Sequence, residues 1–331
     1  MTTDPGTTDP GTTDPGMTEP AELPLVLGEV EVASVDRLSP SFVRVELGGA
    51  CLAEMDVDGS WLDQRFKVIF PCDDGSLPQL PMAGATWWEA WQALPEEERG
   101  SMRTYTVRDV RGLGEHRRLV VDIVVHEHVD GEPDGPGNRW ASAAAEGDRL
   151  LVLVPRRGHE FGGREFAPAP TDRVLLVADE TAVPAVAGIL RDLGPDAAGC
   201  ALLEVPTSAD VQALEGPAGV EVHWLPRDGA ARGDLLHAAT VARLGVDPRE
   251  LPEVDDDEVD PNVWETPVYS SSGEQIAPDP GADVREGLYA WIAGESKVVT
   301  GLRRHLVRER GVDRGQVAFM GYWREGVSMR G

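Results

Sequence analysis

Residues 103–108 bring two guanidinium groups, an aromatic ring and a hydroxyl together in the pattern Arg103-x-Tyr105-Thr106-x-Arg108. They fall where we expect a strand, and side chains alternate between the two faces of a strand. Arg103 and Tyr105 should therefore share one face, with Thr106 and Arg108 on the other unless the strand bends. Such a set can pack a ring on a flavin, hydrogen-bond a ring nitrogen and hold a diphosphate. A surface strand with one aromatic residue and two exposed arginines is the alternative.

A segment of small residues, Gly135-Pro136-Gly137, precedes a predicted helix that begins near Asn138. Backbone N–H groups at such a helix N-terminus are exposed, and the helix dipole favours a phosphate there. The segment therefore predicts a phosphate-binding turn, and a plain helix cap is the alternative.

Asp179 and Glu180 follow a near-continuous apolar segment, 173–178, which is typical of a buried parallel strand. Open α/β sheets bind ligands at the carboxyl ends of such strands, although acids here could also simply begin a helix. His126 and His128 stand two residues apart on a predicted strand edge, so their side chains face the same way. No third residue has a suitable ligand spacing, and we predict no metal site.

Four further segments strengthen the flavin interpretation when they are taken with residues 103–108. They read Asp-Gln-Arg-Phe-Lys-Val-Ile-Phe-Pro (63–71), Gly-Pro-Gly-Asn-Arg-Trp-Ala (135–141), Asp-Glu-Thr-Ala-Val-Pro-Ala (179–185) and Gly-Tyr-Trp-Arg-Glu-Gly (321–326). In order and approximate spacing, the five segments resemble the siderophore-interacting protein family, the FAD-containing ferric-siderophore reductases of the ferredoxin-reductase superfamily. The resemblance extends from about Leu25 to Gly326.

The resemblance implies that Thr106 lies near the flavin N5 atom, that Tyr105 packs on the ring, and that Arg103 and Arg108 bind phosphate. Asn138 stands where the family often has serine, which puts that hydroxyl contact in doubt. Further residues that the resemblance places at the cofactor are Asp122, Val124, His126, Gly137, Asn138, Trp140, Thr181, Ala182, Tyr322 and Trp323. Ordinary reductases of the superfamily carry a glycine-rich turn at the position of Asp179-Glu180, so a non-standard nicotinamide site is implied.

Only two lysines accompany 28 arginines, and both lie in segments that resemble the family's substrate pocket. A basic cleft would attract an anionic ferric chelate against the unfavourable overall charge. The candidates for this cleft are Lys67, Arg156, Arg157, Lys297 and Arg304.

The formal charge of −28 is concentrated in two segments. Residues 1–24 carry −5 and residues 246–283 carry −11, which leaves −12 on the remainder. This balance argues against binding to nucleic acid or to an anionic membrane, because both need a basic surface. No apolar segment approaches a membrane span, no secretory signal is visible, and three separated cysteines indicate reduced thiols in the cytoplasm.

Two domains are expected in a chain of 331 residues. Residues 1–24, with three Thr-Thr-Asp-Pro-Gly repeats, predict a disordered tail. Short apolar segments over 25–168 predict an antiparallel FAD-binding β-barrel, with a helical insertion at 85–94 that carries three tryptophans. Strand–helix alternation over 169–331 predicts an α/β domain with a largely parallel sheet, interrupted by a structureless acidic insertion at 246–283.

We therefore predict a ferric-siderophore reductase in which FAD passes electrons from NADH or NADPH to chelated Fe(III). The loop 205–210 has no arginine for a 2′-phosphate and weakly favours NADH. A ferredoxin is the alternative donor, and a monomer is expected. The alternative functions are a flavin-dependent reductase of another acceptor and a non-enzymatic, flavin-containing siderophore-binding protein.

Overall fold

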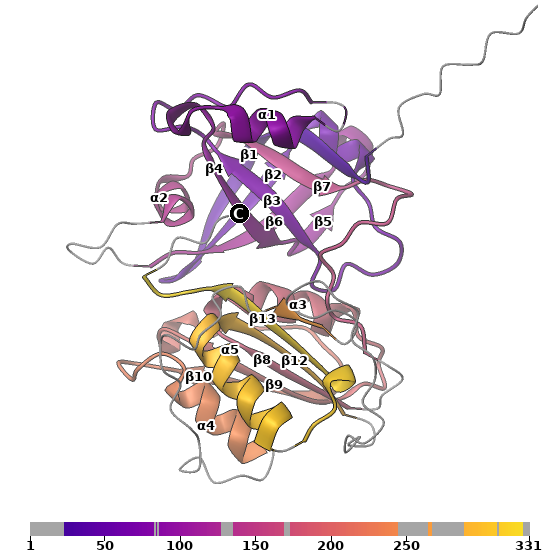
Figure 1. The fold of residues 1–331 in the computed structure, drawn as a ribbon, viewed down its shortest axis with the longest axis vertical. Helices are drawn as coiled ribbons and strands as arrows, with labels where there is room; N and C mark the ends of the chain where they lie inside the picture. Colours follow the sequence, from indigo (N-terminus) through magenta and orange to yellow (C-terminus); the bar gives the residue numbers. More distant parts are fainter. Residues whose placement is uncertain are drawn as a thin grey trace, which may run out of the picture.

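The computed structural model describes residues 23–82, 84, 86–126, 135–168, 173–243, 264–266, 288–309 and 311–326. Figure 1 shows an antiparallel barrel packed on an α/β unit, which confirms the predicted fold class. His128, nearly all of the N-terminal tail and most of segment 246–283 lie outside the described residues. No helix among the described residues is long and apolar enough to cross a membrane.

The barrel is one seven-stranded sheet in which all neighbouring strands are antiparallel, in the order β4-β3-β7-β1-β2-β6-β5. Its strands are β1 Leu25–Ser39, β2 Phe42–Gly48, β3 Arg65–Phe70, β4 Ser101–Thr106, β5 Asp109–Arg111, β6 Arg118–Val124 and β7 Arg149–Pro155. Their alternating apolar residues fill the barrel. After β4 the chain bends, and the backbone N–H of Arg108 donates to the carbonyl of Val120 in β6 at 2.9 Å. The strand that we expected around residues 103–108 therefore ends at Thr106, and β5 begins at Asp109.

Two helices complete the barrel. Helix α2 (Pro136–Ala143) packs against β3 and β6, beside the seam where β4 approaches β6 without a strand ladder in the described residues. Helix α1 (Trp87–Ala93) forms most of the predicted helical insertion and carries Trp87, Trp88 and Trp91. These three tryptophans are partly buried and pack on an apolar cluster on the outer face of the barrel, and Trp88 and Trp91 also line a large cavity.

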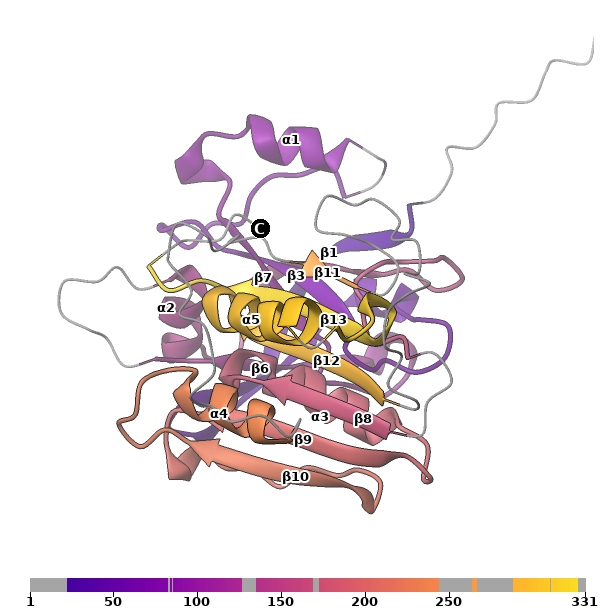
Figure 2. The same cartoon turned by 60° about the horizontal axis from the view of Figure 1, so that its bottom comes forward.

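The α/β unit has the sheet order β10-β9-β8-β12-β13-β11. Its parallel strands are β8 Arg173–Ala178, β9 Ala198–Val205, β10 Gly219–Pro226, β12 Leu288–Glu295 and β13 Val317–Trp323. Helix α3 (Val183–Asp192) packs on one face of the sheet, and α4 (Asp234–Arg243) and α5 (Ser296–Arg303) pack on the other (Figure 2). The short helical turns are η1 Ala50–Glu54, η2 Glu96–Glu98, η3 Gly114–His116, η4 Glu180–Ala182, η5 Ser208–Asp210, η9 Arg314–Gln316 and a π-helical turn, η8 Arg304–Glu309.

Strand β11 (Trp264–Glu265) corrects one expectation. It lies inside segment 246–283, which we predicted to be structureless, yet it pairs antiparallel with β13 at the edge of the sheet. The physical reason is the side chain of Trp264, which stacks on Tyr322 with ring centroids 5.8 Å apart. The prediction is therefore wrong at these residues, and the rest of the segment lies outside the described residues.

Three carboxylates join the barrel to the α/β unit. Asp63 is fully buried and accepts the indole N–H of Trp291 at 3.0 Å. Asp192 accepts the backbone N–H of Leu62 at 2.8 Å, and Asp210 accepts that of Ser41 at 2.8 Å. These contacts fix where the end of β13 stands relative to the barrel.

The contact between Gly188 of α3 and the carbonyl oxygen of Leu62 gives the first prediction. A Cβ at position 188 would stand 2.1 Å from that oxygen. We expect Gly188→Ala to lower the free energy of unfolding, because overpacking costs about 1–3 kcal/mol and outweighs the ~1 kcal/mol gain in helix propensity. Urea denaturation measures the change. Gly194→Ala is the control, since a Cβ there meets nothing within 4 Å, and equal midpoints for both variants would contradict the expectation.

Candidate functional site

The predicted alternation along β4 is present. Arg103 and Tyr105 pair with Val68 and Phe66 of β3, whose side chains belong to the barrel interior. Thr106 lies on the opposite face and is 6% exposed. Tyr105 meets Phe70 edge-on at 6.1 Å, and its hydroxyl fills the space where a Cβ at Gly137 would stand, 2.2 Å away. The glycine therefore allows the strand motif and the start of α2 to approach closely.

Helix α2 begins at Pro136, and its N-cap residue, Gly135, makes no side-chain hydrogen bond to the helix. The Asn138 amide does not cap the helix either. It accepts the backbone N–H of His126 at 2.8 Å and donates to the carbonyl of His126 at 3.2 Å. Trp140 packs on Phe70 with ring centroids 5.4 Å apart.

A cavity of about 1930 Å³ lies beside the start of α2 and is lined in part by Arg103, Pro136, Arg139 and Trp140. Four guanidinium groups and seven carboxylates line it in all, and Arg103 is the guanidinium that comes from the strand motif. Burial lowers the pKa of the Arg103 guanidinium from its usual value, although the group stays charged at neutral pH. A guanidinium and an uncapped helix N-terminus at one cavity form a fitting set for a diphosphate. These residues therefore fit the ADP half of FAD.

Asp122 and Arg108, both predicted at the cofactor, are engaged with each other. The Asp122 carboxylate accepts two hydrogen bonds from Arg44, at 2.7 and 2.8 Å, and lies 3.4 Å from Nε of Arg108. The backbone carbonyl of Arg108 accepts Nη1 of Arg191 from α3 at 2.8 Å. This ion-pair group supports the seam and the contact between the two domains. Val124 ends β6 and packs into the apolar cluster of the α/β unit.

Aromatic side chains from the end of β13 approach the barrel motif. The buried Tyr322 hydroxyl lies within reach of Thr106 but has no well-formed hydrogen-bond partner in the described part of the chain. The Trp323 ring lies 6.2 Å from the ring of His126, so His126 stands at the junction of the two domains, and its role at the cofactor stays a prediction. No group of three or more metal-ligating side chains occurs among the described residues.

Asp179 holds Trp323 in place. Its carboxylate accepts the indole N–H of Trp323 at 2.8 Å, the backbone N–H of Glu295 at 2.7 Å, and both the N–H and the hydroxyl of Thr181. Thr181 therefore stabilises the turn that follows β8 by donating to Asp179. Its neighbour in η4, Ala182, is fully buried. Glu180 forms a two-point ion pair with Arg227, at 2.8 and 2.9 Å.

Sequence reasoning missed several residues of this region. Arg65 lies 4.1 Å above the ring of Trp264, and Arg232 lies 4.6 Å above that of Trp323. Arg227 joins Glu180 to Glu204, and both carboxylates are fully buried. A lone tryptophan in an acidic segment was the one available signal for Trp264. The arginines had none, because their partners lie far away in the sequence.

The predicted basic residues divide into two groups. Lys67 pairs with Thr104 on the same strand face as Thr106, and burial lowers its pKa. Lys297 is exposed near the start of α5, and Arg304 begins η8 two helical turns later. In contrast, Arg156 pairs with Glu54, and Arg157 pairs with Asp56 at 3.2 Å. Contacts among the described residues do not bring all five side chains together in one cleft, so their substrate role stays a prediction.

The carboxyl of Asp179 gives the second prediction. Burial and the neighbouring Glu180 raise its pKa to about 6. This pKa is higher than the ~3.9 of an aspartate in the unfolded chain, so the folded state binds the proton more tightly. The contribution of Asp179 to the free energy of unfolding should therefore fall as the pH rises from about 4 to 6, and stay constant above pH 6. Protonation also removes an acceptor from the Trp323 indole. We expect tryptophan fluorescence to titrate with a midpoint near pH 6, and to lose that transition in Asp179→Asn and Trp323→Phe. An unchanged transition in both variants would refute the assignment.

Comparisons with known proteins agree with this arrangement. Residues 31–159 match the family model for the siderophore-interacting FAD-binding domain, and residues 171–326 match that for siderophore-interacting protein. The crystal structure of a siderophore utilization protein from T. fusca is 31% identical, covers 93% of this chain and 96% of its own, and has a TM-score of 0.65.

Several curated relatives have names that describe an activity, and two of them illustrate it. Ferric vibriobactin reductase ViuB from Vibrio cholerae is 28% identical over 289 residues, with 87% of this chain and 86% of the relative covered. The NADPH-dependent ferric-chelate reductase of Escherichia coli is 27% identical over 302 residues, with 89% and 92% covered. The matched domains, the strand motif and the Gly-Tyr-Trp segment together show that the chain belongs to the siderophore-interacting protein family.

Proposed function

We propose that the chain is a ferric-siderophore reductase that binds FAD and takes electrons from NADH or NADPH. The observation that carries this proposal is the start of α2, which has no side-chain cap and lies with Arg103 at a cavity of about 1930 Å³. The names of the V. cholerae and E. coli relatives support a ferric chelate as acceptor and a nicotinamide as donor.

FAD, when bound, supplies the conversion of hydride transfer into single-electron transfer, and the protein supplies binding and orientation. Arg103 and the first N–H groups of α2 would hold the diphosphate. Tyr105 would pack on the flavin, and Thr106 would donate a hydrogen bond at the ring edge. Tyr322 and Trp323, held by the α/β unit, would exclude water from the opposite side.

Lys67 is the strongest candidate for binding the chelate, because it shares the strand face of Thr106. A cation beside the flavin would hold an anionic ferric siderophore at a short electron-transfer distance from the flavin. Reduction lowers the charge of the iron, which weakens its attraction to the siderophore oxygens and favours release. The reaction needs no covalent nucleophile and no general acid. Lys297 and Arg304 would extend the basic surface from α5, while Arg156 and Arg157 would first have to exchange their carboxylate partners.

The proposed site uses residues of a single chain, which is compatible with the predicted monomer. Cys51, Cys72 and Cys200 are free thiols, which supports the proposal that the reaction takes place in a reducing cytoplasm.

Anaerobic absorption spectroscopy tests the proposal. The FAD-loaded protein should be bleached by NADH or NADPH, and a ferric siderophore should restore the oxidised spectrum. Bleaching by reduced ferredoxin alone would instead identify a protein donor. Restoration by a quinone or free flavin, but by no ferric chelate, would contradict the proposed acceptor.

Arg103 provides the third prediction. We expect Arg103→Ala to weaken FAD binding by about 10- to 100-fold, because hydrogen bonds to charged groups contribute about 1.5–3 kcal/mol. Flavin fluorescence during titration of the apoprotein measures the dissociation constant. Arg111→Ala is the matched control, since Arg111 is an exposed β5 residue paired with Glu46. Wild-type affinity in Arg103→Ala would remove the main support for the site.

A further inference from the structure

Trp264, which lies inside the acidic segment 246–283, reaches the junction of the two domains. It belongs to β11 and pairs with Met320 of β13, so Tyr322 is its diagonal neighbour on the same strand face. The Trp264 indole stacks on the Tyr322 ring, with centroids 5.8 Å apart and an interplanar angle of 11°. The edge strand thereby sets an aromatic side chain against the end of β13.

The barrel contacts the same indole. The guanidinium carbon of Arg65 lies 4.1 Å from the centroid of the Trp264 ring, well inside the ~6 Å limit of a cation–π contact. Arg65 is the cross-strand partner of Thr106, so the two side chains stand on one face of β3 and β4. Glu165 accepts Nη2 of Arg65 at 2.5 Å and holds the guanidinium. Trp264 therefore touches the barrel through Arg65 and the end of β13 through Tyr322.

The ring of Tyr322 is held more completely than its hydroxyl. Besides Trp264, the indole of Trp291 meets the ring edge-on, with centroids 6.3 Å apart. The hydroxyl is buried and within reach of Thr106, yet it has no well-formed hydrogen-bond partner in the described part of the chain. Burial raises the pKa of the phenol above its usual value, so the hydroxyl keeps its proton and can donate. Nε of Arg65 is a second buried donor for which the described residues supply no acceptor.

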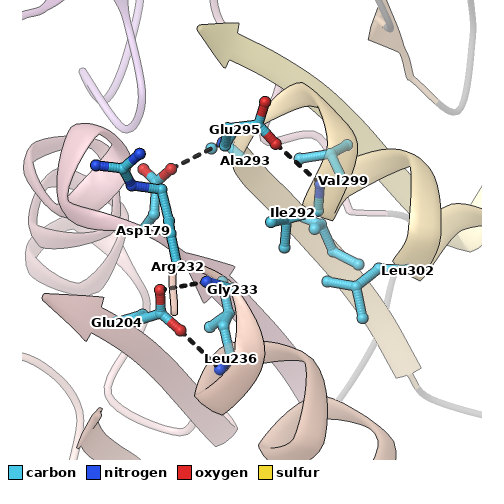
Figure 3. Close-up of a pocket in the computed structure, with 12 residues that line it drawn as sticks. Asp179, Glu204, Arg232, Gly233, Leu236, Ile292, Ala293, Glu295, Val299 and Leu302 are labelled. Carbon is cyan, nitrogen blue, oxygen red and sulfur yellow. Dashed lines mark hydrogen bonds between the residues drawn. The ribbon is translucent and has the colours of Figure 1, made fainter. Parts of the chain in front are cut away.

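The next residue of β13 provides the contrast. The single N–H of the Trp323 indole donates to Asp179 at 2.8 Å, and Arg232 lies 4.6 Å above the ring. Figure 3 shows Asp179 beside Arg232, with its carboxylate also joined to the backbone of Glu295. The donor of Trp323 is therefore used within the protein. Buried polar groups are normally paired, so the Tyr322 hydroxyl is the group at this end of β13 that points to a ligand.

We propose that Trp264 is a positioning residue for FAD: it holds the Tyr322 phenol beside Thr106, where the hydroxyl donates a hydrogen bond to an acceptor atom of the bound flavin. This inference rests on the proposed function, because the ligand is the FAD of the same site. Trp264 acts through Tyr322, and Arg65 keeps the indole in place. The acidic segment thus contributes to cofactor binding through its aromatic residue.

Tyr322→Phe tests the hydroxyl while keeping the ring. Because the hydroxyl lacks a well-formed partner among the described residues, its removal should not lower the urea midpoint of the apoprotein. We expect the same variant to bind FAD about tenfold more weakly, as the loss of one hydrogen bond predicts. Flavin fluorescence during titration of the apoprotein measures the dissociation constant. A lower urea midpoint with wild-type affinity would show that the hydroxyl bonds Thr106 instead, and would overturn the proposal.

Two substitutions of Trp264 test the stack. We expect Trp264→Ala to weaken FAD binding by about tenfold, because Tyr322 is no longer held, and Trp264→Phe to stay within about threefold of the wild type, because a ring remains. Trp87→Ala is the matched control, since Trp87 is also partly buried but packs in α1 on the outer face of the barrel. Equal losses of affinity in Trp264→Ala and Trp87→Ala would contradict a specific role for Trp264.

The double variant separates positioning from a general loss of stability. If Trp264 acts through Tyr322, the two effects are not additive, and Trp264→Ala with Tyr322→Phe should bind FAD only about tenfold more weakly than the wild type. Independent effects would multiply to about a hundredfold and would refute the coupling. Urea denaturation of each apoprotein shows that the variants are folded.

These binding measurements do not depend on turnover. If the wild type binds FAD but reduces no ferric chelate, the proposed reaction is wrong, and the double variant still decides the role of Trp264. If the wild-type apoprotein binds no FAD, both proposals are wrong.

Discussion

Burying a carboxylate is possible only when hydrogen-bond donors replace the water that it loses. This constraint organises the carboxyl edge of the α/β unit and, through Asp63, its contact with the barrel. Asp63, Asp179, Glu180, Glu204 and Glu295 are all at most 6% exposed. Each accepts backbone N–H, indole or guanidinium donors, because an unpaired buried charge would cost several kcal/mol. The donors come from distant segments, so the carboxylates fix those segments relative to one another.

Two consequences for the site follow from this. Asp63 joins the barrel to β12 through Trp291, and Asp179 joins the ends of β8 and β12 to the Trp323 side chain of β13. The aromatic end of β13 is thereby held opposite the barrel motif. Carboxylates also cap α4 and α5, while α2 keeps a free N-terminus beside Arg103.

Local patterns in the sequence were sufficient for most of the fold. The apolar segment 173–178 coincides with β8, and the alternation of Arg103, Tyr105 and Thr106 between strand faces is present in β4. The same reasoning failed where a partner lies far away in the chain. Glu204 reads as one polar residue in an apolar strand, and nothing nearby indicates that it will cap a helix about thirty residues later. Trp264 was placed in a structureless insertion because its neighbours in the sequence are acidic and nothing in the sequence indicates its contact with Tyr322. Arg108, to which the family resemblance assigns a phosphate, lies 3.4 Å from Asp122, and its phosphate role stays a prediction.

The central claim is that the open seam of the barrel holds FAD, with the aromatic end of β13 beside the flavin. A crystal structure of the FAD-loaded protein tests both parts at once. The account predicts a flavin between Thr106 and the end of β13 and a diphosphate at Arg103 and the start of α2. A diphosphate away from Arg103, or a flavin away from β4, would contradict it.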